Sequence, residues 1–139
     1  MKNLTTILVI FAFGFASILH PEEASTGKDK KYSKLIVGVW NSDITIETVS
    51  IKGVNTYKKD GIFLFKAKLK AGTQEIAIDI EGTWKVEKEF LITKVSKTNV
   101  PALLKVGEII KDQMLELNES LYKYKDEDGL IVTDIRSKK

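Results

Sequence analysis

Residues 74–86 decide the fold, and they read QEIAIDIEGTWKV. Apolar or small side chains occupy every second position from Ile76 to Val86, and mostly polar side chains lie between them. Side chains alternate between the two faces of an extended backbone, so this pattern is typical of a β-strand with one buried and one solvated face. The sequence therefore predicts a long strand over about residues 73–86.

The run that precedes this strand has the same period of two. Between residues 62 and 70, apolar side chains occupy the odd-numbered positions, and lysines occupy positions 66, 68 and 70. If Ala71 and Gly72 form a two-residue hairpin loop, the apolar faces of the two runs coincide, and Phe65 lies opposite Ile78. We therefore predict a hairpin with this register.

Further turns join alternating runs in the same way. A loop at 59–61 that ends in glycine places Tyr57 opposite Phe63. A turn at 118–119 places Leu115 opposite Tyr122, and the Asp-Gly pair at 128–129 places Tyr124 opposite Thr133. These turns predict eight strands, over about residues 35–42, 47–58, 62–70, 73–86, 89–96, 107–117, 120–126 and 130–136.

The predicted fold class is all-β. Nearly every connection is as short as a hairpin loop, the exception being 97–106, and no segment shows sustained helical periodicity. Consecutive antiparallel strands with one apolar face each close most economically into an up-and-down barrel, because closure removes exposed strand edges. We expect an eight-stranded antiparallel barrel over residues 35–137.

The N-terminus has the pattern of an export signal. Lys2 precedes an uncharged stretch over residues 3–19, and small residues at 14 and 16 favour cleavage after Ala16. An uncleaved membrane anchor is the alternative, but 17 residues fall short of the roughly 20 that a spanning helix needs. We predict a signal peptide over 1–16, a flexible linker over 17–34, no transmembrane segment in the mature protein, and a periplasmic or extracellular location.

The composition excludes several classes of site. The chain has no cysteine and one histidine, His20, so a disulfide, a thiolate nucleophile or a Cys-type zinc site is excluded. A net charge of +3 argues against a nucleic-acid partner. The acidic turn at 126–129 lacks the ligand spacing of a calcium loop, and the predicted registers place no carboxylate pair inside the barrel. We therefore expect no metal, no cofactor and no enzymatic activity.

A short motif on the first strand suggests a family. Gly38 and Trp40 form a Gly-x-Trp, and a lone arginine, Arg136, lies on the last predicted strand. This arrangement resembles the lipocalin-like proteins of the calycin superfamily. A second Gly-x-Trp at Gly82–Trp84 makes the chain more similar to small bacterial lipocalin-like domain proteins. The resemblance implies a barrel in which the arginine packs across Trp40, although the predicted register points Arg136 away from the core and leaves that contact to the barrel end.

The predicted inward faces carry aromatic side chains with a few polar ones, Asn55 and Gln113. Aromatic walls with a few polar groups are typical of an apolar ligand pocket. The candidate ligand-binding residues are Tyr57, Phe63, Phe65, Trp84, Tyr122 and Tyr124.

Two functions remain open. The barrel could bind a small hydrophobic ligand, or its core could be filled and the protein could act as a non-enzymatic interaction module for an envelope protein partner. The second function would use an outward apolar patch, predicted at Val54, Ile62 and Leu64. An internal cavity of a few hundred cubic ångströms would favour the first function.

Overall fold

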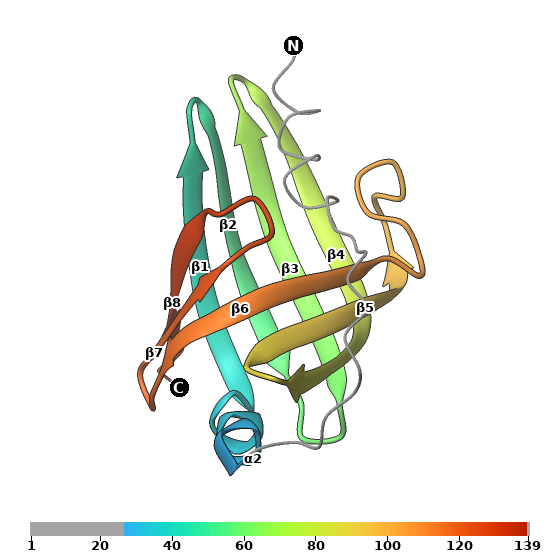
Figure 1. The fold of residues 1–139 in the computed structure, drawn as a ribbon. Helices are drawn as coiled ribbons and strands as arrows, with labels where there is room; N and C mark the ends of the chain where they lie inside the picture. Colours follow the sequence, from blue (N-terminus) through green and yellow to red (C-terminus); the bar gives the residue numbers. More distant parts are fainter. Residues whose placement is uncertain (1–26, 139) are drawn as a thin grey trace.

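The computed structural model describes residues 27–138, which form one helix and eight strands (Figure 1). The predicted signal peptide and the first part of the linker lie outside the described residues. The elements are α2 (Gly27–Leu35), β1 (Gly38–Ile46), β2 (Val49–Tyr57), β3 (Ile62–Ala71), β4 (Gln74–Glu87), β5 (Phe90–Thr98), β6 (Ile109–Leu117), β7 (Leu121–Lys125) and β8 (Ile131–Arg136).

The eight strands form a closed barrel in sequence order. Each strand is antiparallel to the next, and β8 closes on β1, where Trp40 pairs with Arg136 and Asn41 with Ile135. The predicted all-β, up-and-down, eight-stranded fold is therefore confirmed. We call the end with α2 and the β2–β3, β4–β5 and β6–β7 connections the helix end, and the opposite end the cavity end.

The β2–β3 register is the predicted one, with Tyr57 opposite Phe63. The β3–β4 register differs by two residues, because the loop is Gly72–Thr73 rather than 71–72 and Phe65 lies opposite Ile80. Gly72 has a φ of 67°, a left-handed conformation that glycine adopts without steric cost. A shift of two residues keeps the same side chains inside, so the predicted faces of β3 and β4 are correct.

The predicted register of β6 and β7 is wrong. The pairing shifts between Met114 and Glu116, so that Leu117, not Leu115, lies opposite Tyr122. This bulge gives β6 one extra residue and leaves Leu115 40% exposed. Before the bulge the faces are reversed from the prediction: Gln113 is exposed, and its neighbour Asp112 lines the barrel interior.

The predicted register of β7 and β8 is wrong by one residue. The Asp126 backbone N–H donates to the Leu130 carbonyl at 2.9 Å, and the Asp126 side chain accepts hydrogen bonds from the Asp128 and Leu130 amides, each at 2.9 Å. The loop therefore has three residues, 127–129, and Tyr124 pairs with Val132 rather than Thr133. Because side chains alternate along a strand, this shift exchanges the inward and outward faces of β8 and places Asp134 inside the barrel.

The predicted linker is wrong from residue 27 onward, because α2 is a helix packed on the helix end of the barrel (Figure 1). It buries Tyr32 and Asp29, which lie three positions apart and therefore on one helical face. The Asp29 carboxylate accepts hydrogen bonds from the amides of Lys88 and Glu89, at 2.7 and 2.9 Å. Both residues have positive φ, so α2 also stabilises the tight β4–β5 turn.

The Gly-x-Trp motif and the arginine meet at this helix end. Trp40 is fully buried, and its indole Nε1 donates to the Ile36 carbonyl at 2.8 Å. The reversed face of β8 directs Arg136 onto Trp40, with its guanidinium carbon 4.3 Å from the ring centroid. A Cβ on Gly38 would collide with that guanidinium, so glycine is required beside this pair.

Candidate functional site

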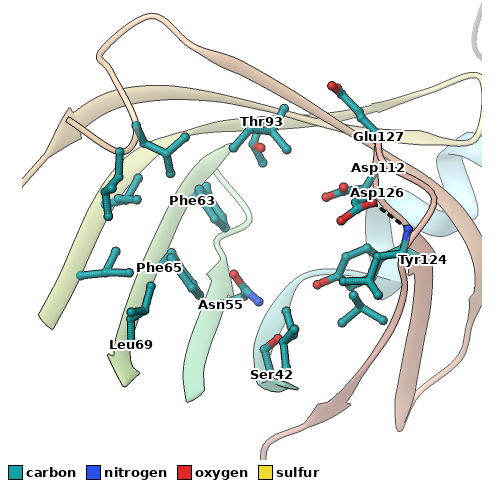
Figure 2. Close-up of a pocket in the computed structure, with 18 of the residues that line it drawn as sticks. Ser42, Asn55, Phe63, Phe65, Leu69, Thr93, Asp112, Tyr124, Asp126 and Glu127 are labelled. Atoms are coloured by element: carbon teal, nitrogen blue, oxygen red, sulfur yellow. Dashed lines mark hydrogen bonds between the residues drawn. The ribbon is translucent and has the colours of Figure 1, made fainter. Parts of the chain in front are cut away.

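The cavity end of the barrel holds an internal pocket of about 110 Å³ (Figure 2). Its apolar walls come from β1 to β4, and the β5–β6 and β7–β8 loops border it. The volume is smaller than the few hundred cubic ångströms that would by itself favour ligand binding over a filled core. The apolar wall residues include Ile44, Phe63, Phe65, Leu69, Ile78 and Ile80, with Leu103, Leu104 and Leu130 from the loops.

Four of the six predicted ligand-binding residues line this pocket, namely Tyr57, Phe63, Phe65 and Tyr124. The prediction that Trp84 lines it is wrong. Its indole Nε1 donates to the Lys58 carbonyl at 2.9 Å, and its ring meets Tyr57 edge-on at 6.1 Å between centroids. Trp84 therefore packs against the wall residue Tyr57 and does not line the pocket itself.

Tyr122 also lies outside the pocket. It is fully buried, with its ring stacked on Tyr124 at 4.6 Å and edge-on to Trp40 at 6.1 Å. Tyr57 and Phe63 stack at 5.2 Å on the opposite wall. The interior is thus filled with packed rings around Trp40 and Tyr122 and hollow at the pocket, so the core combines the two predicted states.

Polar side chains lie among the apolar walls. Ser42, Asn55 and Thr93 are buried residues that face the pocket. The Asn55 amide donates to Oδ2 of Asp134 at 3.2 Å, which places a fully buried carboxyl behind the pocket wall. The other oxygen, Oδ1, and the Tyr122 hydroxyl have no hydrogen-bond partner among the described residues. Unpaired buried polar atoms are rare in native structures, and they gather at functional sites.

The carboxyl of Asp134 titrates near neutrality. Burial raises its pKa from 3.8 to about 7, and the side chains of Ser42, Asn55 and Tyr124 limit the rise. The same burial, together with nearby carboxylates, raises the pKa of the Tyr57 and Tyr124 hydroxyls well above 10. These tyrosines therefore stay neutral and can donate hydrogen bonds.

Asp112 is the second inward carboxyl. It is half-buried on β6 and lines the pocket directly. Burial raises its pKa well above the usual value, and the carboxylates of Asp126, Glu127 and Asp134 raise it further. The prediction that the barrel contains no inward carboxylate pair is therefore wrong. The alternation of apolar residues could not reveal Asp112 and Asp134, because a bulge and a loop of unexpected length bring them inside.

Within residues 27–138, no group of carboxylates or histidines is arranged to hold a metal ion. Over the same residues, no helix is both long enough and apolar enough to span a membrane. The outward patch is only partly exposed, since Val54 is 37% exposed whereas Ile62 and Leu64 are half-buried.

The sequence matches no model of a protein family, and no curated protein aligns with it significantly.

Proposed function

We propose that the protein is an exported, lipocalin-like, non-enzymatic protein that binds one compact ligand in the cavity end of its barrel. The observation that carries the proposal is the 110 Å³ pocket with apolar walls, which lies next to the packed hydrophobic core. The N-terminal sequence pattern supports export, so the ligand would be met outside the cytoplasm.

The size of the pocket limits the class of ligand. An apolar cavity of about 150 Å³ takes up a benzene molecule, and pockets for drug-sized ligands measure about 300–1,000 Å³. A pocket of 110 Å³ is smaller than both, so it encloses at most one small ring or a short branched chain, and the rest of a ligand would extend toward the bordering loops. A long fatty-acid chain or a retinoid would not fit inside.

Apolar burial alone gives weak binding in such a pocket. Burying about 150 Å² of ligand surface contributes roughly 4 kcal/mol, which corresponds to a dissociation constant of about 1 mM. A useful affinity therefore requires polar contacts as well. The lining offers polar side chains for them, among them Ser42, Asn55, Thr93, Asp112, Asp126 and Glu127.

A cavity-filling variant tests the proposal. Val132→Phe adds volume toward the pocket, whereas Ile131→Phe adds the same kind of ring on the exposed face of β8 and is the matched control. We expect calorimetric titration with small monocyclic compounds to show saturable binding to the wild type and to Ile131→Phe, and none to Val132→Phe. Circular dichroism checks that both variants fold. Equal binding to both variants, or no binding to the wild type, would contradict the proposal.

The alternative function, an interaction module for an envelope protein, has weaker support. It requires a filled barrel and an exposed apolar patch. The cavity end is hollow, and of the three patch residues only Val54 is substantially exposed.

A further inference from the structure

Three carboxyl groups line one side of the pocket, and a fourth is buried behind its wall. Asp112 reaches it from β6, and Asp126 and Glu127 reach it from the β7–β8 loop. Figure 2 shows these three acids together, with Phe63 and Phe65 across the pocket from them. Asp134 lies behind the wall and adds to the electrostatic field at Asp112. The pocket therefore has an apolar aromatic side and an acidic side.

None of the four acids forms an ion pair among the described residues, although the charge of Lys111 limits the rise that burial causes in the pKa of Glu127. The ion pairs in that part of the chain are Lys28–Glu89, Lys70–Glu75 and Lys85–Glu87, none of which includes the four acids. The single arginine is engaged at the helix end, where it donates to the carbonyls of Leu35, Val37 and Glu119. The Asp112 carboxyl on this side of the pocket therefore has no ion-pair partner among the described residues.

The four acids differ in what they already bind. Asp126 accepts two backbone amides of its own loop, and Glu127 Oε2 accepts the Lys111 amide at 3.0 Å. The Asp112 carboxyl has no side-chain hydrogen bond and no ion pair within residues 27–138, although Asp112 lines the pocket. It is the carboxyl that remains available to a ligand.

A cation satisfies this environment better than any other group. An ionised carboxylate in an apolar site is costly unless an opposite charge pairs with it. Burial and the neighbouring acids accordingly raise the pKa of Asp112. An ammonium group would provide that charge, and the rings of Tyr57 and Tyr124 would add cation–π attraction. A carboxylate ligand, in contrast, would be repelled by the three acids that line this side of the pocket, Asp112, Asp126 and Glu127.

We propose that the pocket binds a small amine, with its ammonium group at Asp112 and its compact apolar body against Phe63 and Phe65. This proposal rests on the proposed function and specifies its ligand class. The absence of any metal-holding arrangement among the described carboxylates favours an organic cation over a metal ion.

Three probes of similar shape test the proposal by calorimetry at neutral pH: 2-phenylethylamine, 2-phenylethanol and phenylacetate. They place an ammonium, a hydroxyl or a carboxylate on the same kind of small aromatic body. We expect the amine to bind at least about tenfold more tightly than the alcohol, as a charge-assisted hydrogen bond implies, and phenylacetate not to bind. Tighter binding of the alcohol or of the carboxylate would overturn the proposal.

The variant Asp112→Asn then tests whether the ammonium group contacts the Asp112 carboxyl. This substitution keeps the size of the side chain and removes its charge, and Glu116→Gln removes a carboxylate from the exposed side of the same strand as the matched control. We expect Asp112→Asn to weaken the amine by about tenfold or more and to leave 2-phenylethanol unchanged, while Glu116→Gln alters neither. Circular dichroism confirms folding.

The two proposals fail in different ways. If both the amine and the alcohol bind the wild type and Asp112→Asn weakens neither, the amine proposal is wrong and the proposed function stands. If none of the three probes binds and the monocyclic compounds also fail, the proposed function itself is wrong, and the amine proposal fails with it.

Discussion

The two halves of the barrel satisfy their polar groups to different degrees. At the helix end, Trp40 donates to a backbone carbonyl, and Arg136 uses its guanidinium on three carbonyls and one aromatic ring. Between this packing and the pocket, the Tyr122 hydroxyl and one oxygen of Asp134 have no hydrogen-bond partner among the described residues. At the cavity end, the Asp112 carboxyl has no ion-pair partner among them. A half with paired polar groups and packed rings stabilises the fold, whereas unpaired polar groups around a cavity favour a site for a ligand.

The difference is also one of charge. The one arginine of the chain is used at the helix end, and its delocalised charge is matched by carbonyl dipoles and an indole face. The inward carboxyls of Asp112 and Asp134, in contrast, form no ion pair among the described residues. Substitutions at the helix end should therefore change stability directly, and substitutions at the cavity end should change how stability depends on pH and on ligand.

The largest expected effect belongs to the helix end. Trp40→Ala removes a fully buried indole and its hydrogen bond, so we expect a loss of about 3–5 kcal/mol in the free energy of unfolding. Urea unfolding measures it. An unchanged midpoint would show that the packed half does not hold the barrel together.

Asp134→Asn tests the cavity end. The folded state raises the pKa of Asp134 from 3.8 to about 7 through burial, so the folded protein holds a proton that the unfolded chain releases. The corresponding stability is fully present below about pH 4 and is lost as pH rises through 7, by at most about 4 kcal/mol. We expect Asp134→Asn to remove this pH dependence. The free energy of unfolding, measured with urea, should then vary less between pH 4 and 8 in the variant than in the wild type. Parallel profiles for the two proteins would contradict it.

Gly38→Ala should have a smaller effect, again at the helix end. Gly38 has a φ of 142°, and an added Cβ would meet the Arg136 guanidinium. We expect a loss of roughly 1–3 kcal/mol in the free energy of unfolding. Gly27→Ala, where nothing lies near the added Cβ, is the control and should change stability by less than about 0.5 kcal/mol. Equal effects of the two substitutions would argue against a steric role for Gly38.

The helix-end packing could be predicted in part. Gly38, Trp40 and Arg136 were recognisable as a group from the resemblance, and the structure brings them together. The helix that covers them was not predictable, because Tyr32 is the only aromatic residue on α2 and a single buried ring produces no periodic pattern. The burial of Asp29 depends on the β4–β5 turn, which lies almost 60 residues away in the chain.

The apolar wall of the pocket was predictable, and its acidic side was not. Phe63 and Phe65 lie in an alternating run whose inward face survives a register shift of two residues. Asp112 and Asp134 lie in strands where the register changes by one residue, and a change of one residue exchanges the two faces.

By itself, therefore, the sequence determined that the chain forms eight antiparallel strands and which faces of β2 to β4 are inward, because alternation over long runs is a local property. Only the tertiary structure decided the inward faces of β6 and β8. The reason is that a bulge at Leu115 and the hydrogen bonds of Asp126 set their registers, and the choice depends on how neighbouring strands pair around the closed barrel. The candidate ligand contact, Asp112, depends on that choice.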